Sequence, residues 1–578
     1  MAKNPNGGTE TKGGPSADPP PEGGDGALGR LSRRLGLRTD PVIFFVSAGL
    51  MVVFLILMLL LPGQINDVFT AGRDWIVTNL GWFFILGVTA WLVFLAWAAL
   101  SRYGNLRLGG DESRPEYSNL SWFAMLFAGG IGTVLMFWGV AEPITHFAKP
   151  PKAGVEPHSV EASQEAMNFS LYHLSLHTWA IFTLPGLAFG FFIYRYGLPM
   201  RVSSVFYPFL KQRIYGPIGK TIDIFAVLGT LFGLAVSLGL GTSQVAAGLG
   251  ALTPLSDSVG TRVLVIVVLT TVAVSSIVAG LDKGVKRLSN LNILMAVGLM
   301  IFVLVAGGQT VFLFRQIFES TGRYLESIVG LSLWNDAMAG YTKDGGWGWQ
   351  GGWTVFYWAW TVTWAPFMGV FLARISKGRT IRQFVGGVLV APSLFTVVWF
   401  AIFGWSAMRI DGIGGDGGDL TREVVTNEQI PLAMFEFFSN YPAVTLIQGI
   451  AIVVVALFFA TSSDSASLVV DMLCTGDGDP GPVRQRLFWG IAEGTLAASL
   501  IVFGGDEALK ALQQVITVIG LPIFLLCFLM MFSLAKGLRQ ESHAAYAAQL
   551  SHMQRGAQPP ADTKPPSKEV STGSAQKS

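Results

Sequence analysis

Aromatic side chains gather in one apolar stretch, Gly351 to Phe367, which reads GGWTVFYWAWTVTWAPF. A tryptophan in a dry core usually needs a partner for its N–H, and an aromatic belt at a membrane interface explains only the ends of a span. Aromatic faces in mid-span can attract a cation, and quaternary ammonium is the common ligand of such cages. The stretch therefore predicts a cation-binding surface, with core packing as the alternative. Six aromatic residues in this stretch and just after it recur at helical spacing and so form one stripe on a helix: Trp353, Tyr357, Trp360, Trp364, Phe367 and Phe371.

A second apolar stretch, ALFFATSSDSAS, carries hydroxyl groups from Thr461 to Ser467. Hydroxyls can complete an oxygen cage around a hard cation where backbone carbonyls are also free. Free carbonyls are expected in a third stretch, where Gly129, Gly130 and Gly132 interrupt an apolar run and favour an unwound helix. Together these stretches predict a site for a hard cation. The alternatives are hydroxyls that bond back to their own helix and close helix packing at the glycines.

Four ionisable side chains lie close to these stretches. A carboxylate within a span is a functional candidate, but Asp464 lies near a span end, where we expect an ion pair with an arginine of the adjoining loop. Glu142 follows the glycine-rich run and is expected to cap it or to lock a gate. His173 and His177 are four residues apart and so share a helix face. We expect hydrogen bonds between helices from both, with a proton relay as the alternative, and we expect no metal site.

The sequence offers no enzyme active site. It has no phosphate loop, no HExxH and no GxSxG motif. Cys474 and Cys527 lack the spacing of a disulfide framework or a metal site. Of the 578 residues 51% are hydrophobic and 13% are charged, whereas soluble proteins carry roughly a quarter of their residues as charges. The chain is therefore expected to be an all-α integral membrane protein, not an enzyme, with no nucleic-acid partner and no cofactor beyond a coupling ion.

Twelve apolar stretches are long enough to cross a membrane, because a spanning helix needs about 20 residues. Between the seventh and the eighth, RYLESIVGLSLW is expected to form an amphipathic helix on the surface. The predicted spans cover residues 42–62, 80–100, 119–141, 168–194, 222–251, 262–280, 291–314, 351–373, 384–408, 441–471, 486–504 and 514–535.

Most of the 39 Lys and Arg residues fall in alternate loops and in the two tails. Because such residues favour the cytoplasmic side, both termini are expected in the cytoplasm. An even number of spans agrees with this, since it places both termini on the same side of the membrane. The N-terminal segment shows no cleavable signal, since its apolar run is long and is followed by further spans. Tails 1–40 and 541–578, which are polar and rich in proline, are expected to be disordered. A twelve-helix membrane domain is then expected over residues 41–540.

The third and eighth predicted spans are both interrupted, the third by glycines and the eighth by Pro366. They are five spans apart and cross in opposite directions, so each could open a five-helix unit, spans 3–7 and spans 8–12. Inverted repeats of this kind are the plan of secondary transporters that bind substrate at the membrane midplane between broken helices. The pattern predicts a carrier with two extra N-terminal helices. A solute channel is the alternative, although a channel needs a continuous polar lining.

The stretch WTVFYWAWTVTWAPFMGVFLARISKGRTIRQF resembles the signature of the betaine/choline/carnitine transporter family. MLFAGGIGTVLMFWGVAEP, HTWAIF, GTLFGLAVSLGLGT and TSSDSAS are also similar to that family, in the expected order, over roughly residues 40 to 540. By motif style the chain looks nearer to the choline-type branch. The resemblance implies a LeuT-like fold over spans 3–12, a homotrimer in lipid of the bacterial plasma membrane, and import of choline, glycine betaine, carnitine or a similar osmolyte by alternating access, driven by sodium or protons.

The resemblance also implies a substrate cage built from spans 4 and 8. Leu174 and Thr361 stand where the family often has aromatic residues, so the cage is thinner than usual. Val134 follows neither the glycine of betaine carriers nor the aspartate of choline-type members. A non-quaternary osmolyte such as ectoine, taurine or dimethylsulfoniopropionate is therefore the alternative substrate. The implied substrate-binding residues are Trp179, Phe182, Trp358, Trp360, Thr361, Trp364, Gly132 and Thr133.

The family's second sodium position is implied between spans 3 and 10. Its oxygens would come from the backbone carbonyls of Ala128, Ile131 and Phe458 and from the hydroxyls of Thr461 and Ser462. Proton-coupled members can keep these hydroxyls, so the choice between sodium and protons stays open at this point. The mixed charge of the C-terminal tail gives no support for an osmosensor.

Overall fold

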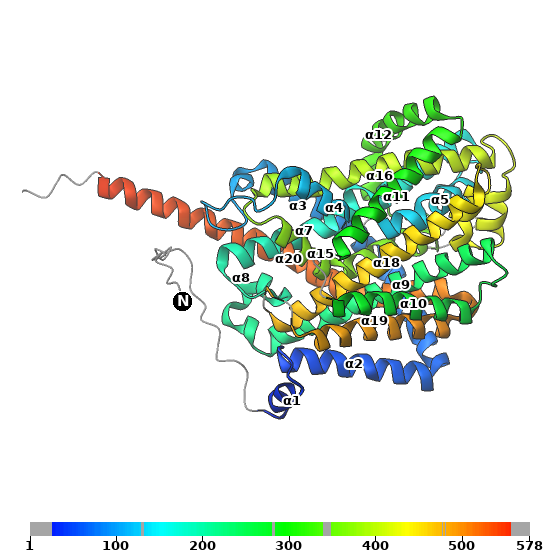
Figure 1. Ribbon diagram of the computed structural model, residues 1–578. Helices are drawn as coiled ribbons and strands as arrows, with labels where there is room; N and C mark the ends of the chain where they lie inside the picture. The colour runs from blue at the N-terminus through cyan, green and yellow to red at the C-terminus, as the bar shows by residue number, and fades with distance from the viewer. Residues whose placement is uncertain are drawn as a thin grey trace, which may run out of the picture.

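The computed structural model describes residues 26–128, 132–279, 284–338, 348–476, 478–479 and 481–556, and within these ranges it is an all-helical protein without strands. One isolated antiparallel bridge joins Arg107 to Thr380. Most of the long helices run side by side in one bundle, some of them inclined to the rest (Figure 1). The prediction of an all-α membrane protein is thus confirmed.

Nine helices among the described residues are long and apolar enough to cross a membrane. They are α2 (Pro41–Leu60), α3 (Pro62–Leu100), α6 with α7 (Val160–Leu174 and Leu176–Tyr196), α9 (Pro217–Leu252), α10 (Val259–Ala279), α16 (Ile381–Asp411), α18 (Val444–Thr475), α19 (Val483–Gly504) and α20 (Ala508–Gly556).

Two further pairs of helices pass the same test only when each bent pair is counted as one span. One pair is α11 (Gly284–Ala306) with α12 (Thr310–Leu333), bent by 116°, and the other is the predicted eighth span, bent by 55°. The predicted third span corresponds to α4 (Asn119–Ala128) and α5 (Gly132–Ala148), but its junction lies outside the described residues. The count of twelve spans therefore stays a prediction.

The predicted eighth span is irregular over much of its length. It comprises α13 (Gly348–Gln350), a π-helical turn η5 (Gly351–Val355), α14 (Phe356–Thr363) and α15 (Ala365–Ile375). The 55° bend falls at Trp364. Pro366 lacks a backbone N–H and so cannot complete the ladder at this point, which is a common cause of a kink. The proline signal read from the sequence thus marks the bend correctly.

Several helices extend beyond the predicted boundaries. α3 begins at Pro62 rather than near residue 80, because Pro62 stands at a favourable first helical position. α12 covers the predicted amphipathic helix and exposes Phe314, Phe318 and Leu325. α1 (Ala27–Leu35) lies within the tail that was predicted to be disordered, ending at a left-handed Gly36, and α20 continues to residue 556.

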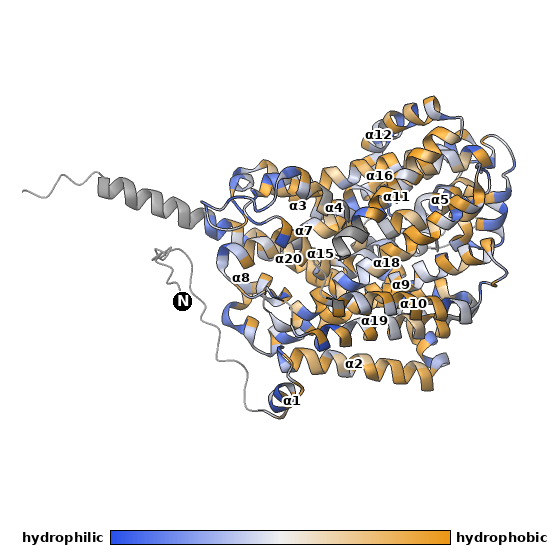
Figure 2. Cartoon of the chain, viewed as in Figure 1, coloured by the Kyte–Doolittle hydropathy of each residue, from blue (hydrophilic) through white to orange (hydrophobic). Residues whose placement is uncertain are grey.

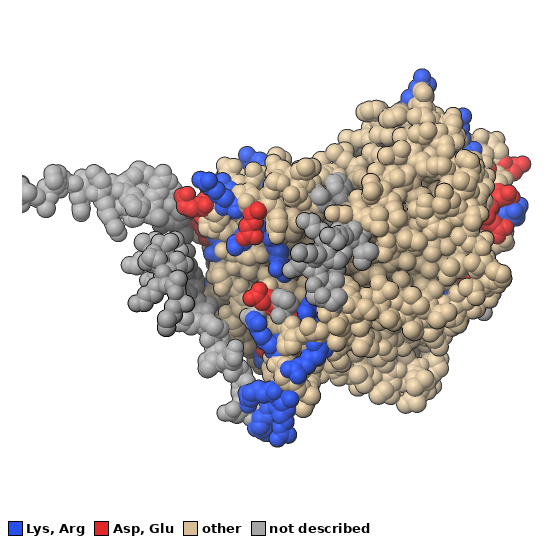
Figure 3. Space-filling view, viewed as in Figure 1, with Lys and Arg blue, Asp and Glu red and all other residues tan. Residues whose placement is uncertain are grey.

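The surface follows the arrangement expected for a membrane protein. α2 lies at one edge of the bundle with an apolar outer face (Figures 1 and 2), and its Leu59 is 80% exposed. Charged side chains gather toward the two ends of the face shown in Figure 3, and most of the described side chains between them are uncharged. α1 and the C-terminal part of α20 lie at the same end of the bundle (Figure 1).

The interior helices position the site. α15 packs against α7, α14 against α20, α5 against α16, and α9 against α18. α6 and α7 meet at Ser175, whose φ of −106° and ψ of −123° interrupt the helix. The shorter helical elements are η1 (Arg102–Asn105), η2 (Val202–Phe206), α8 (Tyr207–Leu210), η3 (Lys211–Tyr215), η6 (Thr421–Thr426), η7 (Ile430–Leu432), α17 (Ala433–Phe438) and η8 (Gly505–Glu507).

Candidate binding site

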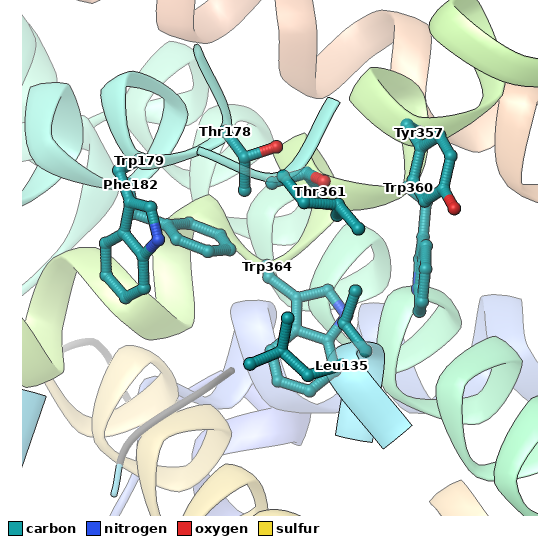
Figure 4. Close-up of a pocket in the computed structure, with 10 residues that line it drawn as sticks. Leu135, Thr178, Trp179, Phe182, Tyr357, Trp360, Thr361 and Trp364 are labelled. Carbon is teal, nitrogen blue, oxygen red and sulfur yellow. The ribbon is translucent and has the colours of Figure 1, made fainter. Parts of the chain in front are cut away.

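A cavity with an empty volume of about 500 Å³ lies where α5, α6, α7 and α14 meet. Figure 4 shows Trp179 and Phe182 on one side of it, Tyr357 and Trp360 on the other, and Trp364 with Leu135 below. The full lining is Val134, Leu135, Leu174, Thr178, Trp179, Phe182, Tyr357, Trp360, Thr361 and Trp364.

The α14 wall is fixed from behind by helix α9. The indole Nε1 atoms of Trp360 and Trp364 donate to the same oxygen, Oγ of Ser237, at 2.9 and 3.1 Å. α14 can approach because Gly233 has no side chain, and a Cβ there would stand 2.2 Å from Oγ1 of Thr363. The polar edges of both indoles are thus bound by α9, and both rings line the cavity.

The opposite wall is formed by the end of α6 and the start of α7. The rings of Trp179 and Phe182 meet edge to face, with centroids 5.6 Å apart and planes at 77°. Leu174 and Thr178 lie on either side of the interruption at Ser175 and also reach the cavity. The break in this span therefore brings residues from both of its halves to one surface.

Among the described residues, the lining contains no Lys, Arg, Asp, Glu or His side chain. Its polar atoms are the hydroxyls of Thr178, Thr361 and Tyr357 and the indole N–H groups. The Tyr357 hydroxyl is already donated to Glu142, at 2.7 Å. Aromatic faces without an ion-pair partner suit a ligand whose positive charge is spread over methyl groups and cannot donate strong hydrogen bonds.

The structure brings five of the eight predicted substrate residues to the cavity: Trp179, Phe182, Trp360, Thr361 and Trp364. Trp358 is fully buried but lies outside it, with its ring stacked on His177 at 6.1 Å. Its helical position turns it away from the stripe that holds Trp360, so the assignment by resemblance is not supported. Gly132 and Thr133 belong to the first turn of α5. Gly132 is not among the lining residues, and the side chain of Thr133 lies outside the described part of the structure.

Leu135 and Thr178 line the cavity but were not singled out from the sequence. Leu135 follows Val134 on α5, and its position depends on how α5 crosses α14. Thr178 faces the cavity because the helix is interrupted at Ser175, and a pattern of apolar residues carries no signal for such an interruption.

The predicted sodium region is only partly described, because Ile131 lies outside the described residues. The Phe458 ring does lie against the start of α5, since a Cβ on Gly132 would stand 1.9 Å from it. The Thr461 hydroxyl bonds back to its own helix, 2.8 Å from the Leu457 carbonyl and 3.1 Å from that of Phe458. Ser462 is half-buried beside it, and Ala128 ends α4. The expected neighbours are thus close, but Thr461 follows the back-bonding alternative.

Glu142 is the centre of a buried hydrogen-bond network that the sequence did not reveal. Its Oε1 lies 2.6 Å from Nδ1 of His173 and 3.3 Å from Nε2 of His146, and its Oε2 accepts from Tyr357. Nε2 of His173 lies 2.8 Å from the Thr354 hydroxyl. The facing atoms of Glu142, His146 and His173 lie within 4.8 Å of one another, a spacing that a metal ion could also use. Because these contacts are hydrogen bonds, we treat the group as a network rather than as metal ligands.

The prediction that Glu142 caps the end of its helix is wrong, since α5 continues to Ala148. His173 and His177 have different partners, because His177 lies 2.8 Å from Oγ of Ser332 in α12. The helix interruption at Ser175 separates them. The expectation of hydrogen bonds between helices is confirmed for both histidines.

Within the part of the chain that the structure describes, no arginine lies within ion-pair distance of Asp464, while the side chain of Arg287 lies outside that part. Oδ2 of Asp464 accepts a hydrogen bond from Ser276 of α10 at 3.4 Å. A second carboxylate in this region, Glu493, was missed by the sequence analysis. It is buried in the middle of α19 and accepts a hydrogen bond from Ser463 at 3.1 Å.

These observations describe a multi-pass helical membrane protein with a central, aromatic-lined cavity between broken helices. Residues 42–543 match the family described as betaine/carnitine/choline family transporter. The chain belongs to this family, which confirms the resemblance read from its motifs. It is a transporter and not an enzyme.

The curated relatives are similar to the chain over most of their length. The ectoine/glycine betaine/proline transporter EctP of Corynebacterium glutamicum is 44% identical over 89% of this chain and 82% of its own. A probable glycine betaine transporter of Desulfitobacterium hafniense is 41% identical, covering 86% and 97%. The high-affinity choline transport protein of Escherichia coli K12 is 38% identical, covering 88% and 74%.

Proposed function

We propose that the protein is a secondary active transporter that imports a quaternary-ammonium or related zwitterionic osmolyte across the bacterial plasma membrane. The observation that carries the proposal is the cavity, where Trp179 and Trp360 face each other across a space whose described lining residues carry no charge. Such a surface recognises a methylated ammonium group through cation–π attraction and shape.

Choline, glycine betaine and carnitine are the leading substrates, and ectoine or proline is the second possibility. The first relative named above is a transporter of ectoine, glycine betaine and proline by its name. Leu174 and Thr361 supply an aliphatic and a hydroxyl surface where further rings would enclose a trimethylammonium group more completely. This thinner cage favours a carrier that accepts several zwitterions.

Alternating access around an inverted, LeuT-like repeat is the proposed mechanism, with twelve spans of which 3–7 and 8–12 correspond. The packing of the helices supports this correspondence. Span 3 corresponds to span 8, which are represented by α5 and α15, and span 4 corresponds to span 9, which are α7 and α16. The contact between α7 and α15 therefore has its counterpart in the contact between α16 and α5, and both contacts are present. In the same way span 5 (α9) corresponds to span 10 (α18), and span 12 (α20) to span 7 (α11). The contact between α9 and α20 has its counterpart in the contact between α18 and α11, and both are present.

Sodium is the proposed coupling ion, bound between α18 and the broken third span. Two hydroxyls, Thr461 and Ser462, and the carbonyls of Ala128, Ile131 and Phe458 would supply five oxygens without a carboxylate. The contact between Gly132 and Phe458 supports the required approach of the two spans. Thr461 would have to turn its hydroxyl away from the carbonyls it now bonds. We further propose a homotrimer with both termini in the cytoplasm.

The deciding experiment is a binding screen of the purified protein against choline, glycine betaine, carnitine, ectoine, proline and taurine, with and without sodium. At least one methylated ammonium compound should bind, and uptake into proteoliposomes should saturate and follow an imposed gradient. Binding of none of these compounds would refute the proposed substrate class. Uptake that does not saturate would instead favour a channel.

The coupling ion is tested separately with imposed gradients. The double change Thr461→Ala with Ser462→Ala should abolish uptake driven by sodium at constant pH. Ser465→Ala is the matched control, because its hydroxyl bonds only to the Thr461 carbonyl, at 2.9 Å. Uptake that does not depend on sodium but is driven by an imposed pH gradient would show that the coupling ion is the proton and not sodium.

A further inference from the structure

The Glu142 network connects buried ionisable groups directly to the cavity wall. Glu142, His146, His173 and Tyr357 each have 0% exposure. The phenol of Tyr357 spans the connection: its hydroxyl donates to Glu142 at 2.7 Å, and the residue lines the cavity. Figure 4 shows Tyr357 beside Trp360 on that wall. A charge in the cavity would therefore stand about one aromatic ring away from the carboxylate.

Within the part of the chain that the structure describes, no lysine or arginine forms an ion pair with this carboxylate. Among the described residues, its ionisable neighbours are His146 on its own helix, His173 from α6 and Tyr357 from α14. The other elements packed against α5, which are α9, α16, α17, α18, η6 and η7, place no described ionisable side chain within hydrogen-bond or ion-pair distance of it. An isolated negative charge is costly in such surroundings.

One additional proton removes that cost. Oε1 of Glu142 lies between two imidazole nitrogens, at 2.6 and 3.3 Å. The proton can therefore lie on the carboxylate or on either ring, and the network takes it up as a unit. With the proton the network is neutral, and without it the network carries one negative charge beside the cavity.

We propose that this network is a proton-binding site that responds to the net charge of the ligand in the cavity, releasing its proton when a cation binds but not when a zwitterion binds. The inference rests on the proposed function, since it takes the cavity to be the substrate site. A cation is attracted to the deprotonated network. A zwitterion brings its own carboxylate and gains much less from that charge.

Linkage gives the direction of the pH effect. If cation binding releases a proton, then removing protons favours cation binding by the same factor. The affinity for choline should rise with increasing pH and fall as the pH is lowered, whereas the affinity for glycine betaine should stay nearly constant. For two charges separated by one aromatic ring in a protein interior, the expected change is on the order of tenfold.

The test compares choline and glycine betaine, which share a trimethylammonium group and differ in net charge. Their dissociation constants are measured on the purified full-length protein between about pH 5.5 and 8.5, at constant sodium. The expected result is a roughly tenfold weakening of choline binding at the acid end with less than about a twofold change for glycine betaine. Parallel pH profiles for the two ligands would overturn the inference and leave the proposed function intact. Binding of neither ligand would refute the proposed function itself.

Glu142→Gln should remove the difference between the two pH profiles, because the variant has no charge to gain or lose at this position. Glu493→Gln is the matched control, since Glu493 is also a buried glutamate within a helix but is bonded to Ser463 on α18. This control should keep the difference. If Glu142→Gln keeps it as well, the network is not the proton site. Should that variant fail to fold, the comparison of the two ligands on the unchanged protein still decides the matter.

Discussion

The two aromatic walls of the cavity are held in different ways. On the α14 side, Trp360 and Trp364 are both hydrogen-bonded to Ser237, and Phe356 stacks on Trp360 at 5.7 Å with an interplanar angle of 12°. On the α7 side, Trp179 and Phe182 meet each other edge to face, and the Trp179 indole has no hydrogen bond within the described residues. The α14 wall is thus fixed by specific bonds, whereas packing alone holds the α7 wall.

This difference assigns separate tasks to the walls. The fixed wall can set where a positive charge rests, because its π faces keep one orientation. The wall held by packing, with Leu174 and Thr178 beside it, can adjust to ligands of different shape. Substitutions on the α14 wall should therefore weaken binding of all ligands, and those on the α7 side should change their ranking as well.

The largest effect is expected for Trp360→Leu. The change removes a π face and also leaves Ser237 without one of its two indole donors, so substrate binding should weaken by at least about tenfold for every ligand that binds. Isothermal titration on the purified variant measures it. Trp358→Leu is the control, because that ring lies outside the cavity, and its folded protein should retain its affinity. Equal losses in both variants would argue against the cavity as the site.

Trp179→Leu should weaken binding by about tenfold for trimethylammonium ligands and by less for ectoine or proline. The indole here contributes its face but no bond to the scaffold, so no other side chain loses a partner. Competition against one labelled ligand gives the ranking directly. A uniform loss for all ligands would show that the two walls act alike.

Ser237→Ala tests the fixed wall without touching the cavity surface. Two indole N–H groups lose their shared acceptor, although Trp364 keeps its 3.3 Å hydrogen bond to the Gly233 carbonyl. The weaker fixation of the rings should lower affinity by roughly threefold to fivefold. Ser243→Ala on the same helix is matched to it, since the Ser243 hydroxyl only bonds back to the Gly239 carbonyl at 3.0 Å. Unchanged affinity after Ser237→Ala would mean that packing suffices on the α14 wall too.

Thr361→Trp is expected to have the smallest effect on affinity, a change of about twofold to threefold in the ratio between fully methylated ligands and ectoine. It adds a π face between the two walls, where Figure 4 shows Thr361. The ratio is read from transport assays with both ligands present. An unaltered ratio in a variant that still transports would place Thr361 outside ligand contact.

The sequence predicted what depends on periodicity. The stripe containing Trp360 and Trp364 and the bend at Pro366 were both readable, because helical spacing and a missing N–H act locally. The resemblance alone suggested Trp358, but its angle around the helix places it on the other side. The Glu142–His173 bond joins residues 31 positions apart, and only the packing of α5 on α6 brings them together. Asp464 was expected to form an ion pair with an arginine of the adjoining loop, and the structure shows a hydrogen bond to it from Ser276 of the neighbouring α10.

The contact between Gly132 and Phe458 has a consequence for how this sequence can change over generations. A methyl group at position 132 would overlap the ring of Phe458 on a helix more than 300 residues away in the chain, so a larger residue at 132 requires a smaller one at 458. In a library randomised at both sites, larger residues at 132 should survive only beside smaller ones at 458. At Gly298, where an added Cβ would meet nothing within 4 Å, no such pairing is required. A change at position 132 is therefore expected to follow a change at position 458 and not to precede it.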